Sequence, residues 1–96
     1  MAQKTVLVAD DDKISRMIVK KNIAGVYHVL EAEDGSKALN ILDKHPEVAV
    51  LLLDLIMPGL NGFEVLQALR KDDGTLRLPV IVITAGDDVV AQEKAF

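Results

Sequence analysis

The feature that most constrains the fold is a run of six apolar residues, Val48 to Leu53, that ends on the carboxylate of Asp54. The run is too short for an ordinary helix, and its Val and Leu content is typical of a strand buried on both faces of a sheet. Because an ionised Asp is costly to bury without a partner, Asp54 must lie where solvent, a cation or a bound group reaches it. In an open α/β sheet that place is the crevice at the carboxyl ends of the strands.

The segment after Asp54 predicts a loop followed by a helix. Pro58 in Met57-Pro58-Gly59 removes a backbone donor and restricts the residue before it, so a helix cannot start at once. Asn61 and Glu64 have the spacing of an N-cap and its third helical position, which starts a helix near Gly62. The apolar residues of this helix are Phe63, Leu66 and Leu69.

The rest of the chain alternates strands with helices. Further apolar runs predict strands over residues 5–9, 26–32 and 80–83. One helix has Asp12 as its N-cap and Gly25 as its stop signal, and another starts at Asp34-Gly35 and ends before Pro46. This alternation implies right-handed βαβ units and a parallel sheet, which is the α/β class.

Apolar residues in the first two helices recur at helical spacing. The inner residues of the second helix are Ala38, Ile41 and Leu42. In the first helix, the apolar set is Ile14, Met17 and Ile18, and the basic residues Lys13, Arg16 and Lys20 fall on another face, most simply a solvated one.

Length and composition favour one small domain, residues 1–96, of which half the residues are hydrophobic. Acidic residues outnumber basic ones by 15 to 11, and the basic residues are scattered, so nothing favours a nucleic-acid surface. The N-terminal sequence lacks the apolar core of a signal peptide, and no apolar run approaches the length of a membrane span. A soluble cytoplasmic protein is therefore the default expectation.

Three strand ends carry oxygen ligands. Asp10 and Asp11 follow the first strand, Asp54 follows the third, and Thr84 follows the fourth. If the strand order is 2-1-3-4, these side chains converge at the switch point of the sheet. Clustered carboxylates repel one another unless a cation is present, and Mg²⁺ binds through carboxylates and phosphate oxygens. One carboxylate could then act as a nucleophile and form an aspartyl phosphate, with the hydroxyl of Thr84 holding a phosphoryl oxygen.

These residues resemble the receiver domain of two-component response regulators. The resemblance rests on the Asp10-Asp11 pair after an apolar strand, on the D-x-x-M-P-x-x-x-G segment from Asp54 to Gly62, and on V-I-V-I-T-A ending at Thr84-Ala85. It covers essentially the whole chain. It implies a flavodoxin-like, doubly wound parallel sheet of order 2-1-3-4 and a role in phosphorelay signalling rather than turnover of a separate substrate. The expected phosphodonor is a phosphohistidine of a histidine kinase or histidine phosphotransfer protein, or a small acyl phosphate.

The resemblance also implies roles for individual residues. Asp54 would be the phosphoacceptor and a ligand of Mg²⁺, Asp11 a direct ligand, and Asp10 a ligand acting partly through water. The backbone carbonyl of Ile56 would be a further metal ligand. The phosphoryl group would be contacted by Thr84 and by the backbone amide of Ala85.

The chain departs from the family pattern at its end. Receivers have a fifth strand with a phosphoryl-binding Lys, and a final helix, and this chain has neither. Lys94 falls in the expected fourth helix and is not assigned that role. We therefore expect the sheet to be incomplete, with residues 80–83 as an exposed edge that permits self-association, and an effector domain or protein to act downstream.

Two other functions remain open on the sequence. The chain could be a pseudo-receiver that is never phosphorylated and serves as an interaction module, although the acids and Thr84 argue against this. It could also be a hydrolase of the haloacid dehalogenase type, but that family needs a second Asp two residues after the nucleophile, where this chain has Ile56.

Overall fold

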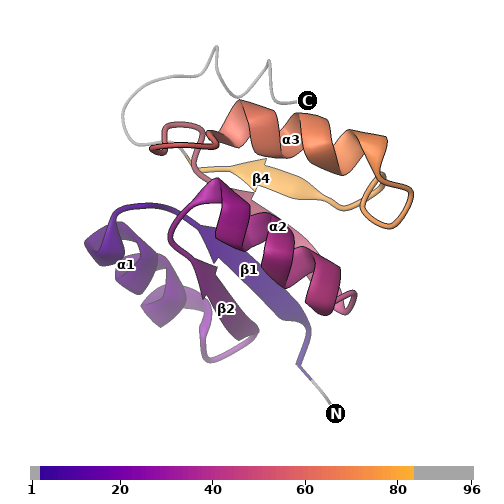
Figure 1. Cartoon of the computed structure of the whole chain (residues 1–96). Coiled ribbons are helices and arrows are strands. Elements are labelled where there is room, and N and C mark those ends of the chain that lie inside the picture. The colour runs from indigo at the N-terminus through magenta and orange to yellow at the C-terminus, as the bar shows by residue number, and fades with distance from the viewer. Residues whose placement is uncertain (1–2, 84–96) are drawn as a thin grey trace.

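The computed structural model describes residues 3–83, which form a parallel sheet flanked by helices (Figure 1). In chain order the elements are β1 (Thr5–Ala9), α1 (Lys13–Ile23), β2 (His28–Ala32), α2 (Gly35–Lys44), β3 (Val48–Leu53), α3 (Gly62–Lys71) and β4 (Val80–Val82). The predicted α/β class is confirmed. Within residues 3–83, no helix combines the length and the apolar character needed to span a membrane.

The four strands lie in the order β2-β1-β3-β4, and every neighbouring pair is parallel, as predicted. β1 occupies the interior between β2 and β3, with Ala9 opposite Ala32 on one side and Leu53 on the other. Because the strands are parallel and in this register, the residues that follow Ala9 and Leu53 emerge side by side at one edge of the sheet.

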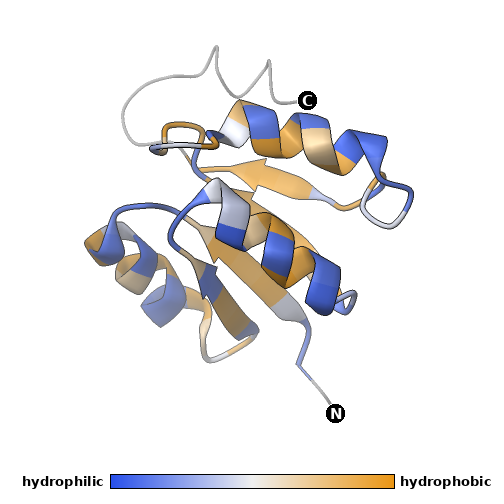
Figure 2. Cartoon of the chain, viewed as in Figure 1, coloured by the Kyte–Doolittle hydropathy of each residue, from blue (hydrophilic) through white to orange (hydrophobic). Residues whose placement is uncertain are grey.

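The main apolar core lies between the sheet and the pair α2 and α3, which cover one face while α1 lies on the other (Figure 1). In Figure 2, β1 and β4 are coloured mainly as hydrophobic, whereas α2 and α3 contain both hydrophobic and hydrophilic segments. Ala38 and Leu42 of α2 are buried as expected, and Ile41 packs at the margin of the core. Fully burying a Leu side chain contributes about 1.5 to 3 kcal/mol, so this core fixes the position of both helices. Its largest fully buried side chains are Leu7, Leu51, Leu53, Leu69 and Val65.

The inner face of α3 differs from the expected one at a single residue. Leu66 and Leu69 are buried, but Phe63 is exposed and Val65 is buried instead. The buried positions Gly62, Val65, Leu66 and Leu69 have the i, i+3, i+4, i+7 spacing of one helix face. Phe63 therefore lies on the flank of the helix.

Helix α1 does not have the orientation that its sequence pattern suggested. None of its residues is buried, and its apolar residues Ile14, Met17 and Ile18 are exposed. The side chain of Arg16, which was expected on a solvated face, is only 12% exposed. The prediction was wrong for Arg16, which polar contacts hold against the sheet, whereas Lys13 and Lys20 are exposed as expected.

Most element ends lie where the local sequence signals predicted them. Asp12 and Asp34 cap α1 and α2, and Asn61 forms a capping box with Glu64 at the start of α3. The second strand begins at His28, two residues later than predicted. The amides of residues 26 and 27 donate to the carbonyl of Ile23 at the end of α1, so they are unavailable to the sheet.

Candidate functional site

The candidate site lies at the carboxyl edge of the two central strands. The amide of Asp54 donates to the carbonyl of Ala9 over 2.9 Å, and the amide of Asp10 donates to the carbonyl of Ala32 over 3.1 Å. These bonds continue the parallel ladders one residue past the strands. They therefore place Asp10 and Asp54 as immediate neighbours, as the predicted strand order required.

Three carboxylates converge at this edge. Asp10, Asp11 and Asp54 each offer one oxygen, and these oxygens all lie within 4.8 Å of one another. Asp10 and Asp54 are only 5% and 8% exposed, while Asp11 is exposed. A set of hard oxygen donors at this separation fits Mg²⁺, which binds through a few carboxylates and retains several waters.

The pKa of the Asp54 carboxyl is raised well above its ordinary value. Burial raises the pKa of its carboxyl, and the negative charges of Asp10 and Asp11 raise it further, to about 6. The amide of Ile56, which donates to the Asp54 carboxylate over 3.1 Å, opposes the shift. A bound cation would offset the part of this rise in pKa that comes from the neighbouring carboxylates.

Asp12 differs from its two acidic neighbours, as expected. Its carboxylate accepts hydrogen bonds from the amide of Ile14 and the hydroxyl of Ser15, at 3.1 and 2.8 Å. The bond from Ser15, followed by the bond from Ile14, lowers the pKa of the Asp12 carboxyl. Asp12 is thus engaged as the N-cap of α1, and its own amide donates to the Asp10 carboxylate over 2.9 Å.

Two glycines shape the path of the chain from Asp54 to α3: Gly59 in the loop and Gly62 at the first position of the helix. Gly59 has φ of +72°, a conformation that side chains disfavour. At Gly62 an added Cβ would lie 2.5 Å from both the Asp54 carbonyl oxygen and the Cα of Leu55. The absence of a side chain at Gly62 therefore lets α3 begin directly against the backbone of the candidate site.

The neighbouring α2 approaches the same loop at Gly35. A Cβ there would lie 2.3 Å from the Leu60 carbonyl oxygen. Between these segments an open hollow reaches Asp11, and its lining is formed by Glu33, Asp34, Ser36, Pro58, Gly59 and Leu60. Asp11 can therefore be reached from solvent through this hollow.

Sequence reasoning missed Arg16, whose guanidinium Nη1 donates to the carbonyl of Asp10 over 2.7 Å. It also missed the close approach of Gly35. A usable signal was present for Arg16, because an Arg in the second turn of a helix that follows an acid pair can reach back to the loop carbonyls with several donors. For Gly35 the N-cap Asp34 explained the sequence without a tertiary contact.

Of the three remaining predicted site residues, only Ile56 lies in the described part of the chain. Ile56 is exposed, and its amide rather than its carbonyl has a contact with Asp54. Thr84 and Ala85 lie outside the described residues.

Comparisons with known proteins agree on one family. The family model of the response regulator receiver domain matches residues 6–96. The chain is 38% identical over 80 residues to a chemotaxis protein CheY homolog of Campylobacter jejuni, which covers 81% of the chain and 62% of that protein. It is 40% identical over 91 residues to a probable transcriptional regulator ycf27 of Porphyridium aerugineum, covering 93% of the chain and 36% of that protein.

Solved structures give the same result. A putative response regulator from Chloroflexus aurantiacus superposes with a TM-score of 0.90 at 28% identity, covering 98% of this chain and 77% of that one. The chain spans only 62% and 36% of the two relatives named above, so their activities as whole proteins do not transfer directly.

Proposed function

This chain belongs to the response regulator receiver domain family, and on that basis we propose that it accepts a phosphoryl group on Asp54 in a Mg²⁺-dependent reaction. The observation that supports the proposal is the convergence of Asp10, Asp11 and Asp54, with oxygens within 4.8 Å of one another. Such a cluster is unfavourable without a cation and is well suited to one.

The proposed chemistry is a displacement at phosphorus. A carboxylate oxygen of Asp54 attacks the phosphoryl group of a phosphohistidine, a P–O bond forms and the P–N bond breaks. The nitrogen keeps the electron pair, and the histidine leaves as neutral imidazole, with the proton that its other ring nitrogen already carried. The amide of Ile56 orients Asp54 by donating to one carboxylate oxygen, which leaves the other available for attack. When bound, Mg²⁺ supplies positive charge that offsets the charge on the acids and on the transferred group.

We assign the ligand roles that the family resemblance implies. Asp11, exposed toward the hollow, is a direct metal ligand, and Asp10 acts partly through water. The Ile56 carbonyl remains a proposed ligand. Thr84 and the amide of Ala85 remain proposed contacts of the phosphoryl oxygens, on the basis of sequence and family alone.

The decisive experiment is incubation of the protein with acetyl phosphate and Mg²⁺, followed by intact mass measurement. We expect a mass increase of one phosphoryl group that hydroxylamine removes, that requires Mg²⁺, and that is lost in Asp54→Asn. If no adduct forms and no phosphate is released, the chain is a pseudo-receiver. Rapid continuous release of phosphate without an adduct would favour a hydrolase.

The proposal extends to partners and location. A histidine kinase or a histidine phosphotransfer protein in the cytoplasm would supply the phosphoryl group, and an effector domain or protein would receive the signal. Self-association remains a separate proposal: β4 is the outermost strand in the described part of the sheet, and its Ile81 is 52% exposed. Light scattering over a concentration series tests it, and a monodisperse monomer at every concentration would exclude it.

A further inference from the structure

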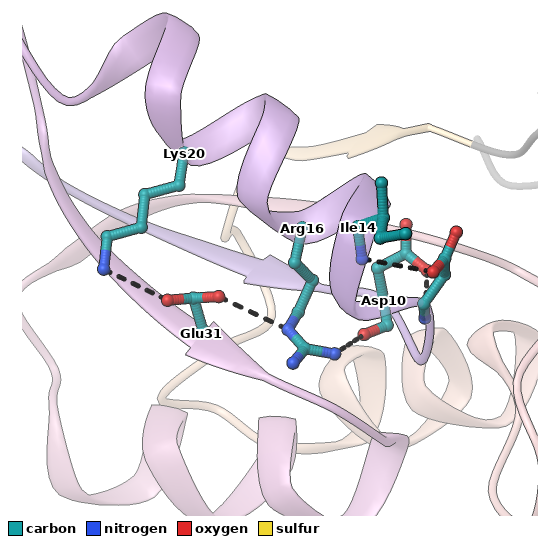
Figure 3. A network of polar contacts seen from close by, with 6 residues as sticks. Asp10, Ile14, Arg16, Lys20 and Glu31 are labelled. Carbon is teal, nitrogen blue, oxygen red and sulfur yellow. Dashed lines mark hydrogen bonds and ion pairs between the residues drawn. The ribbon is translucent and has the colours of Figure 1, made fainter.

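Arg16 connects the candidate metal site to the neighbouring strand. Its guanidinium donates through Nη1 to the backbone carbonyl of Asp10 over 2.7 Å and through Nε to the carboxylate of Glu31 on β2 over 3.4 Å. Figure 3 shows the guanidinium lying between these two groups, with Glu31 also bound by Lys20. The Arg16 side chain is therefore fixed at two points and largely withdrawn from solvent.

We propose that Arg16 is a positioning residue for the Mg²⁺ site, because it fixes the peptide group that joins Asp10 to Asp11. This inference rests on the proposed function, in which those two acids bind the ion. A peptide group is planar, so a bond to the Asp10 carbonyl also sets the direction in which the Asp11 backbone leaves.

The contacts around Asp10 support this role. Its amide is held by the carbonyl of Ala32 on β2 at 3.1 Å, and its carbonyl is held by Arg16, which is itself anchored to Glu31 on the same strand. The amide of Asp10 is thus bonded directly to β2, and its carbonyl is connected to the same strand through Arg16. Its side chain then accepts the Asp12 amide at 2.9 Å, which limits its rotation.

Lys20 provides a matched comparison within the same network. Its ammonium binds Glu31 at 3.1 Å, and this contact is the main cause that lowers the pKa of the Glu31 carboxyl. Lys20 has no recorded hydrogen bond to Asp10, and its side chain is more exposed than that of Arg16. Replacing either residue removes one positive charge and one partner of Glu31, but only the change at Arg16 frees the Asp10 carbonyl.

The direction in which Mg²⁺ affinity changes when Arg16 is replaced distinguishes a positioning role from a purely electrostatic one. A positive charge near a cation site opposes cation binding, so removing the charge alone would strengthen Mg²⁺ binding. Loss of a group that orients the ligands would weaken it instead. Substitutions of residues that orient metal ligands typically reduce metal affinity by about 10- to 100-fold.

The test is a Mg²⁺ titration followed by the amide NMR signals of residues 10 and 11, which reports on the folded protein alone. We expect about tenfold weaker affinity in Arg16→Met, at the low end because Arg16 contacts backbone rather than a ligand atom. Affinity in Lys20→Met should stay within about twofold of the parent, since only a screened surface charge changes. Arg16→Lys keeps the charge and can reach only one of the two partners, so it should lie between the parent and Arg16→Met.

Unchanged or tighter binding in Arg16→Met would show that Arg16 acts only as a charge, and would overturn the inference. If Arg16→Met does not fold, the result for Arg16→Lys decides, and parent-like affinity there would overturn the inference as well. If the parent itself binds no Mg²⁺, the proposed function fails before Arg16 is considered, so the two failures are distinct.

Discussion

Replacing Asp54 with Asn should stabilise the metal-free protein at alkaline pH. Burial, followed by the charges of Asp10 and Asp11, raises the pKa of the Asp54 carboxyl from 3.8 to about 6. The folded state therefore holds this proton more tightly than the unfolded state does. The resulting stabilisation is fully present below about pH 4 and is lost as the pH rises through about 6.

The size of the effect follows from the shift. The rise in the pKa of Asp54 from 3.8 to about 6 sets a ceiling of about 3 kcal/mol, because each tenfold change in proton affinity corresponds to about 1.4 kcal/mol. Asp54 as a residue is only 8% exposed, but its carboxyl is only partly desolvated. Solvent screening then reduces the expected effect to about 1.5 kcal/mol. We expect Asp54→Asn to exceed the parent by this amount at pH 8 and to match it near pH 4.

Urea unfolding followed by circular dichroism suits this chain, which has no Trp and one Tyr. The measured quantity is the difference in unfolding free energy between the parent and Asp54→Asn from pH 4 to pH 8, with a chelator present. Asp73→Asn is the matched control, because it removes the same charge from an exposed loop position. Adding Mg²⁺ at pH 8 should stabilise the parent and leave Asp54→Asn nearly unchanged.

Two results would refute this reasoning. Asp54→Asn could be no more stable than the parent at pH 8, which would mean that the cluster imposes no penalty on the charged form. Alternatively, the gain could be independent of pH or shared by Asp73→Asn, which would assign it to net charge rather than to the site.

Three further predictions concern the residues around the site. Asp11→Ala should weaken Mg²⁺ binding in a titration far more than Asp12→Ala, which removes only a cap worth about 1 kcal/mol of stability, and equal losses would contradict the assignment. Gly62→Ala should lower the unfolding free energy by about 2 to 3 kcal/mol in urea, because its Cβ would meet backbone, whereas Gly25→Ala, with open space around it, should have little effect. Ile56→Asn should speed dephosphorylation in a timed phosphate-release assay, because an amide can orient a water and an apolar side chain cannot; an unchanged or slower rate would count against this.

Elements whose signals are local were predictable to within a residue. β3 runs from Val48 to Leu53 as expected, because an apolar run bounded by polar residues leaves no other register. The caps at Asp34 and Asn61 involve partners only three residues away, so sequence spacing specifies them. The convergence of Asp10 and Asp54 followed from the 2-1-3-4 strand order that the family resemblance implied.

Features that depend on packing were not predictable in the same way. The pattern of α1 predicted a solvated face for Arg16, but the structure holds Arg16 against the sheet and exposes Met17. Which face of a helix meets the sheet depends on partners from other segments, in this case Glu31 on β2. Phe63 is exposed for a similar reason, because the close contact of Gly62 with the Asp54 backbone sets the rotation of α3.

The pairing of β1 with β3 also bears on the order of folding events. These strands are adjacent in the sheet, yet α1, β2 and α2 separate them in the chain, so their contact is non-local and closes a long loop. Asp10 and Asp54 meet only once that loop has closed. Without an ion, repulsion between these two carboxylates opposes closure of the loop. With Mg²⁺ present, closure completes a binding site that earlier folding species lack. In refolding experiments, the ion would therefore report when the two central strands come together.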